Sequence, residues 1–201
     1  SSDIEIAKQC IPTSLKYLNI NVSTNLPDIP PVEFLVCHNK FRLPIGYIPS
    51  SVKYLSLLKL SKDIVPTSVT HLRFYGFYSH EDVIIPPWIT HLIINDNRYN
   101  SLGIRIPSSV THLKIDKITY SDSLIIPESV KHISFGNSVN VYLKGFIPSG
   151  ICEIVFGDDY NTTIRGCIPS SVKCITFGKN FNRSLKKRIP SSVTHLIFRN
   201  E

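Results

Sequence analysis

One pattern of hydrophobic and polar positions recurs along the whole chain. Each copy begins with isoleucine or valine followed by proline, continues through residues rich in serine and threonine, and ends in alternating polar and apolar residues. The clearest copies are residues 106–115 (IPSSVTHLKI) and 189–198 (IPSSVTHLIF). A block that returns at short intervals is typical of a repeat protein whose units stack on one another. The units begin at Ile11, Ile29, Ile48, Val65, Ile85, Ile106, Ile126, Ile147, Ile168 and Ile189.

Within each unit the pattern predicts one short β-strand. With the opening residue as position 1, position 2 is proline, which suits a turn because proline fixes φ and has no N–H. Apolar residues at positions 8 and 10 alternate with residues at 7 and 9, as in a strand with one buried face. The steps between units are 17–21 residues, which leave little room for an interior helix of about 10–12 residues. We therefore expect a mainly β solenoid of about ten units, with parallel strands and little α-helix.

The units predict one continuous array rather than separate domains. Residues 1–10 would form an N-terminal lead-in or cap, and residues 11–201 the solenoid. Apolar residues at positions 1, 5, 8, 10, 14 and 18 would stack into a core that no unit could bury alone. Asn140, Asn161 and Asn182 share position 15, and we expect them to form an internal ladder that bonds the turn backbone of their own and neighbouring units.

Position 7 carries the most conspicuous polar feature. His71, His91, His112 and His132 occupy it in four consecutive units, and aromatic residues hold the same register in earlier ones. Side chains at positions 7 and 9 point away from the core, so this stripe should lie on the open face of the sheet. Imidazoles on parallel strands stand side by side about 4.8 Å apart and do not converge on a metal ion at about 2.1 Å. We therefore predict no metal site. The stripe stabilises adjacent strands or binds a partner, and partner binding does not exclude the stabilising ladder.

The pattern breaks around residues 75–80, which are rich in aromatic side chains, and at Trp88, which replaces the usual serine at position 4. If exposed, these rings would make a hot spot for a protein partner; otherwise they fill the core or a wide turn. No nucleophile beside a base, phosphate-binding loop or dinucleotide fingerprint is recognisable, so we expect neither an enzyme nor a cofactor. The candidate protein-binding residues are His71, Arg73, His91, His112, Lys114, His132, Phe77, Tyr78 and Trp88.

The net charge of +7 comes from the end of the chain. Residues 1–159 hold 14 Lys/Arg and 14 Asp/Glu, whereas residues 160–201 hold 8 Lys/Arg and one Glu. This basic region can be a solvated loop, a docking patch for an acidic protein or a nucleic-acid site. Nucleic acid is the reading we favour least, because no aromatic residues interleave with the charges. The cluster consists of Lys179, Arg183, Lys186, Lys187 and Arg188.

The cysteines and the N-terminal residues bear on where in the cell the protein is located. The five cysteines contain no CxxC pair, which favours reduced thiols that pack as small hydrophobic groups. The first ten residues do not resemble a signal peptide, and no run of about 18 apolar residues predicts a membrane span. We expect a cytoplasmic protein that does not bind membranes and is a monomer rather than a dimer. The absence of methionine indicates a processed or excised product.

Two blocks resemble the FNIP repeat, a relative of leucine-rich repeats that is abundant in social amoebae and in giant viruses that infect amoebae. They are Ile-Pro-Ser-Ser-Val-Thr-His-Leu-x-Phe-Gly, nearest in residues 168–178 and 189–199, and Phe-Asn-x-x-Leu at residues 181–185. The resemblance covers about residues 11–201 and implies a leucine-rich-repeat-like solenoid, in the host cytoplasm if the protein is viral.

The family resemblance also bears on function. Such arrays often follow an F-box, so the resemblance implies a substrate-recognition module of a ubiquitin-ligase-type assembly. Only ten residues precede the first unit, and we expect no F-box among them. We therefore expect a scaffold that binds protein through the open strand face. The alternative is a structural spacer array with no binding site of its own.

Overall fold

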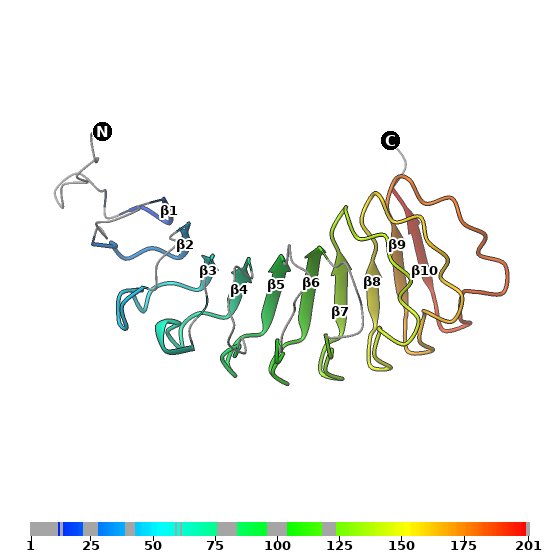
Figure 1. Ribbon diagram of the computed structural model, residues 1–201, viewed down its shortest axis with the longest axis horizontal. Helices are drawn as coiled ribbons and strands as arrows, with labels where there is room; N and C mark the ends of the chain where they lie inside the picture. The colour runs from blue at the N-terminus through cyan, green and yellow to red at the C-terminus, as the bar shows by residue number, and fades with distance from the viewer. Residues whose placement is uncertain are drawn as a thin grey trace.

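The computed structural model describes residues 12, 14–21, 28–38, 43–58, 60, 62–75, 84–95, 104–117 and 124–199. Its ten strands follow one another along a curved row (Figure 1). The single helical element among the described residues is a 3₁₀ turn, η1 (Lys62–Ile64). The strands are β1 (Tyr17–Ile20), β2 (Phe34–Cys37), β3 (Tyr54–Leu57), β4 (His71–Phe74), β5 (His91–Asn95), β6 (His112–Lys117), β7 (His132–Phe135), β8 (Glu153–Val155), β9 (Cys174–Phe177) and β10 (His195–Phe198).

All ten strands belong to one parallel sheet whose spatial order is the order of the sequence. Each strand begins at position 7 of its unit or its equivalent, and pairing aligns equivalent positions. Leu72 lies opposite Leu92, which lies opposite Leu113 in turn. The register shifts once, between Ile94 and Asn95 where β5 meets β6. The prediction of a mainly β solenoid with side-by-side parallel strands is therefore confirmed.

A backbone hydrogen bond to the proline carbonyl closes the turn before every described strand except β2, and in several units a serine adds a bond to the preceding coil. In the unit that begins at Ile106, the N–H of Val110 donates to the carbonyl oxygen of Pro107 at 3.1 Å. The hydroxyl of Ser109 donates to the carbonyl oxygen of Ile89 in the preceding unit at 2.7 Å. The proline therefore supplies an acceptor where its missing N–H is not needed, and the serine joins one coil to the next.

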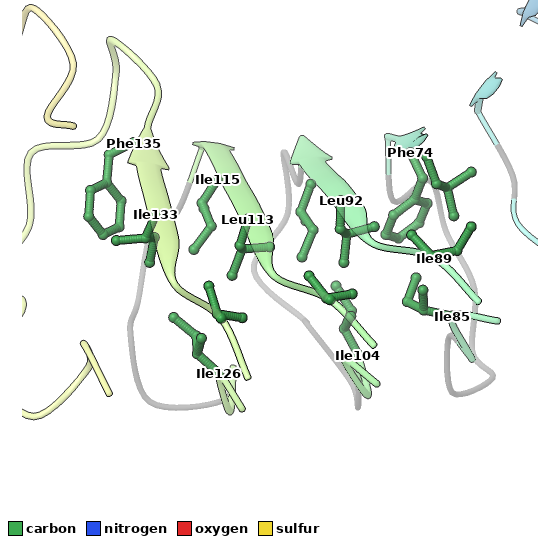
Figure 2. Close-up of a cluster of buried hydrophobic side chains, with 14 of the residues drawn as sticks. Phe74, Ile85, Ile89, Leu92, Ile104, Leu113, Ile115, Ile126, Ile133 and Phe135 are labelled. Carbon is green, nitrogen blue, oxygen red and sulfur yellow. The ribbon is translucent and has the colours of Figure 1, made fainter. Parts of the chain in front are cut away.

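The core is one continuous column beneath the sheet. Leu92, Leu113 and Ile133 come from neighbouring strands and lie in a row (Figure 2), and all three are buried. In the later units phenylalanine takes over position 10. The ring centroids of Phe156 and Phe177 are 5.1 Å apart, and the two rings are nearly parallel. Each interior unit thus buries its apolar face against its neighbours.

The return legs of the last units are joined by the predicted asparagine ladder. The N–H of Asn161 donates to Oδ1 of Asn140 at 2.9 Å, and the N–H of Asn182 donates to Oδ1 of Asn161 at 3.0 Å. The bonds to adjacent units agree with the prediction, but Asn140 and Asn182 are exposed. The ladder lies at the surface rather than inside because apolar positions 14 and 18 already fill the core.

The strand at the end of the array, β10, pairs only with β9 among the described strands. Leu196, Ile197 and Phe198 are 41%, 47% and 45% exposed.

No helix in the described part of the chain has the length and apolarity that a membrane crossing requires. The predicted lead-in at residues 1–10 lies outside the described residues.

Candidate functional site

Six rings form a continuous column on the open face of the sheet. We call Phe34, Tyr54, His71, His91, His112 and His132 the ring stripe; they are the first residues of β2 to β7. Strand pairing places each ring against the next, and neighbouring centroids lie 4.0–4.3 Å apart. The three histidine–histidine pairs are nearly parallel, with interplanar angles of 18°, 11° and 5°. The sequence prediction of an imidazole and tyrosine ladder is confirmed as a geometry.

Threonines hold the histidine rings in place. Nδ1 of His91 lies 2.9 Å from Oγ1 of Thr90, and Nδ1 of His112 lies 2.9 Å from Oγ1 of Thr111. Both threonine hydroxyls also lie within 3.4 Å of a backbone carbonyl oxygen of the preceding unit. Because a carbonyl oxygen can only accept, the hydroxyl donates to it and the imidazole Nδ1–H donates to the hydroxyl. The outer nitrogen, Nε2, is then a hydrogen-bond acceptor.

The stripe ends differently at β7. Lys131 occupies position 6, where the preceding three units have threonine, so His132 lacks a hydroxyl partner there. Its Nδ1 instead bonds Oε2 of Glu153 on β8 at 2.9 Å, with both side chains partly exposed. A carboxylate thus closes the C-terminal end of the stripe.

Stacking disfavours positive charge within the stripe. Partial burial lowers the pKa of His71, His91 and His112 below its ordinary value of 6.5, and neighbouring histidines lower it further. At His112, the charge of Glu153 acts on the pKa in the opposite direction. These three imidazoles are therefore neutral at neutral pH, and this middle part of the ring stripe presents stacked neutral rings to solvent.

The position-9 candidates are paired with an acid that the sequence analysis missed. Arg73 Nη2 lies 3.3 Å and Lys114 Nζ lies 3.0 Å from the carboxylate of Asp116. Arg73 is on β4 and Asp116 on β6, so the pair spans an intervening strand. The local charge is thereby reduced, although both basic side chains stay about two-fifths exposed (37% and 41%). The detectable signal was an acid at position 11, two residues after Lys114.

Of the three aromatic candidates that interrupt the repeat pattern, only Trp88 lies among the described residues. Trp88 packs partly buried against the core, and its indole N–H donates to the carbonyl oxygen of Pro66 at 3.1 Å. This contact ties two turns together and takes up the polar end of the ring. Phe77 and Tyr78 lie outside the described residues, so the arrangement of the three predicted hot-spot rings stays a prediction.

The open face shows no convergent ligand set. Among the described residues, no group of three or more His, Cys, Asp or Glu side chains is placed to hold a metal ion. Cys174 lies in the stripe's register between Glu153 and His195. Burial and the Glu153 charge raise the pKa of its thiol, which disfavours the reactive thiolate. The arrangement on this face is a platform of stacked rings.

The sequence model of the FNIP repeat matches residues 120–159, 140–180 and 160–201. Over residues 120–201 the chain is therefore similar to the FNIP repeat. The units before residue 120 carry the same turn and strand but lack the Phe-Asn block, which first takes clear form around Val139-Asn140. The same turn and strand therefore occur in β1–β6 of the same sheet, whereas the Phe-Asn return half is distinct only in the later units.

A solved structure with a similar fold is CroV588, described as a novel circular leucine-rich-repeat protein. It shares 24% sequence identity with this chain, and the comparison has a TM-score of 0.63. The matched region covers 91% of this chain and 29% of CroV588, so the chain spans less than a third of that protein's length. No curated protein matches the sequence. The array thus has a leucine-rich-repeat-like fold.

Proposed function

We propose that this FNIP array is a non-enzymatic scaffold that binds a partner protein through the ring stripe on the open face of its sheet. Repeat arrays of the FNIP and leucine-rich-repeat kind generally serve as protein-interaction scaffolds. Stacked repeats build extended surfaces, and their neighbours hold those surfaces rigid. Beyond this general role, we propose that the ring stripe is the surface that binds and that its rings are the contact residues.

The observation that carries the proposal is the continuous ring column, whose middle rings, His71, His91 and His112, are neutral. Rings held at 4.0–4.3 Å spacing lose little conformational entropy on binding, which favours affinity. Aromatic and arginine side chains are also the groups that most often dominate protein interfaces. Arg73 and Lys114, which are paired to Asp116, would supply polar contacts at the edge of the stripe.

The second candidate is a ring stripe that only supports the sheet. The threonine–histidine bonds and the parallel stacking favour it, because both would stabilise adjacent strands without any partner. A substrate-recognition role in a ubiquitin-ligase-type assembly stays a prediction from the family resemblance. It needs an additional module, whereas the binding proposal needs only the described face.

A binding experiment distinguishes the two candidates. Wild-type protein would be immobilised and exposed to a lysate of the cells in which it occurs, beside His91→Ala/His112→Ala. The matched control is Ser108→Ala/Ser170→Ala, which alters two exposed turn serines away from the stripe. We expect one partner, identified by mass spectrometry, to be lost from the histidine variant and retained by the control.

A third variant separates the ring platform from the imidazole nitrogens. His91→Phe/His112→Phe keeps two stackable rings, as Phe34 shows for the same register, and removes Nε2 as an acceptor. Loss of the partner here would assign recognition to the nitrogens, and retention would assign it to the ring faces. If the alanine variant keeps every partner and has an unchanged circular dichroism spectrum, the stripe is structural and the proposal is wrong.

A further inference from the structure

Three equivalent turns stack on the return legs of the last units, outside the strands. Each is closed by a backbone hydrogen bond: Phe146 N–H to Leu143, Cys167 N–H to Ile164, and Arg188 N–H to Leu185, at 3.0–3.1 Å. Each turn therefore holds its second and third residues in the same conformation. The asparagine ladder, with 21 residues between its members, fixes the three turns in register.

The second residue of every one of these turns is a base. Lys144, Arg165 and Lys186 occupy this place and are all exposed. Adjacent coils lie about 4.8 Å apart, so the three charges form a row. We call this row, together with Arg183, Lys187 and Arg188, the basic ridge.

No acid neutralises the basic ridge in the part of the chain that the structure describes. The three return segments, residues 140–146, 161–167 and 182–188, contain six Lys/Arg and no Asp or Glu. Arg183 donates to the carbonyl oxygen of Asn161 and Arg188 to the hydroxyl of Thr163, so both are fixed by neutral groups. Like charges this close repel one another, and a bound anion would relieve that repulsion.

Lys187 adds an independent observation. The third residue of each turn has a positive φ: 76° at Gly145, 69° at Gly166 and 56° at Lys187. Glycine adopts this conformation without strain, whereas a residue with a Cβ does not. Lys187 is the only non-glycine residue with positive φ in the described chain. The third turn thus carries a strained lysine where the first two have glycine, and this lysine adds one more exposed cation to the row.

We propose that the basic ridge is a docking surface for an acidic segment of a partner protein, an activity separate from that of the ring stripe. The row is rigid because its turns are tied by the asparagine ladder, and charge complementarity selects a run of Asp or Glu. A nucleic-acid strand would need rings between the charges. Tyr142 is the exposed ring among the three return segments, and its hydroxyl is bound to the carbonyl oxygen of Arg165.

Fluorescence anisotropy with a short labelled polyglutamate peptide tests the proposal. The ridge variant is Lys144→Ser/Arg165→Ser/Lys186→Ser. The control, Lys16→Ser/Lys53→Ser/Lys173→Ser, removes three exposed lysines just before strands and changes the net charge equally. We expect wild type and control to bind alike, and the ridge variant to bind about tenfold more weakly. Binding should also weaken as salt is added.

Each other outcome contradicts the proposal. Equal weakening in both triple variants would mean that only the net charge matters. Wild type that does not bind polyglutamate would remove the surface altogether. A labelled oligothymidine that binds more tightly than polyglutamate, and loses affinity in the ridge variant, would make the ridge a nucleic-acid site instead.

The strained lysine gives a second and sharper test. Lys187→Gly should raise the urea midpoint, because glycine adopts the left-handed conformation freely, and should weaken polyglutamate binding severalfold. Stability and binding would then move in opposite directions, which partial unfolding cannot produce. Unchanged polyglutamate binding in Lys187→Gly would contradict the role of this residue in the ridge.

Discussion

At the scale of single residues, two tyrosines differ in whether their hydroxyl makes a hydrogen bond. Tyr160 is fully buried, and its hydroxyl has no hydrogen-bond partner among the described residues. Burial raises the pKa of this phenol well above its ordinary value. Tyr142, by contrast, is exposed and donates to the carbonyl oxygen of Arg165 at 2.8 Å. An unpaired buried hydroxyl keeps a desolvation cost that a paired one does not.

We therefore expect opposite signs for the same substitution at these two positions. Tyr160→Phe removes an unsatisfied polar atom and should raise the free energy of unfolding by about 1 kcal/mol. Tyr142→Phe removes a made hydrogen bond and should lower it by about 0.5–1 kcal/mol. Urea denaturation of both variants and wild type gives the comparison. A destabilised Tyr160→Phe would show that its hydroxyl has a partner, such as a buried water molecule.

Glycine at position 11 is required by the closeness of the coils rather than by its backbone angle. A Cβ added to Gly157 would clash with the carbonyl oxygen of Gly136, and backbone atoms cannot move aside cheaply. Gly157→Ala should therefore destabilise the protein by about 3 kcal/mol. Gly145 is the opposite case, because its φ is +76° and nothing lies within 4 Å of an added Cβ. Only the left-handed backbone disfavours a side chain there.

Gly145→Ala is thus the matched control for Gly157→Ala. It should cost about 1 kcal/mol, the usual penalty for a Cβ in the left-handed region. The urea midpoints of the two variants would be compared with that of wild type. Equal losses at both positions would mean that the coils separate to accept the new methyl group, which contradicts the close approach seen at Gly157.

At the scale of the elements, the strands were predictable and some of their side-chain partners were not. Leu72, Leu92 and Leu113 recur at one position, and a fixed register follows because any slip would expose all of them together. The pairing of Asp116 with Arg73 across an intervening strand depends on the reach of two side chains, which no repeat register specifies. The left-handed conformation of Lys187 could not be read from the lysine itself, and its signal was the glycine at the same place in the two preceding units.

The ring stripe predicts how the stability of the sheet depends on pH. The pKa of His71, His91 and His112 is lowered in the fold from an ordinary value of 6.5. Between the lowered and ordinary values the unfolded chain binds more protons than the folded one, so stability falls as the pH falls through this window. Above about pH 6.5 the contribution of these rings is fully present.

We expect the urea midpoint of wild type to decrease between about pH 7.5 and about pH 5. In His91→Phe/His112→Phe two rings still stack but cannot take up a proton, so the decrease should be smaller. The nearby carboxylates, Asp116 and Glu153, are the same in both proteins, and the difference therefore isolates the imidazoles. Identical pH profiles would show that the stripe does not oppose protonation.

At the scale of the whole molecule, stability should be a sum over neighbouring coils. Each described strand pairs only with the strand before and after it. Such arrays behave as one-dimensional chains of units coupled to their neighbours. A change inside the array weakens two interfaces, whereas a change on β10 weakens the one described interface with β9.

This one-dimensional coupling predicts a graded response to the same substitution. Leu113→Ala, at a 2% exposed site on β6, should cost about 3 kcal/mol because it opens a cavity between β5 and β7. Leu196→Ala, at a 41% exposed site on β10, should cost about 1 kcal/mol. Urea denaturation of the two variants beside wild type gives both losses.

Hydrogen exchange would then show where the loss in Leu113→Ala is felt. Protection should fall most in β5–β7 and least in β10, because coupling passes only through successive interfaces. Leu196→Ala is the control, since its effect should stay near β9 and β10. A uniform loss of protection from β2 to β10 in Leu113→Ala would mean that the array unfolds as one cooperative unit, so that no coil has a stability of its own.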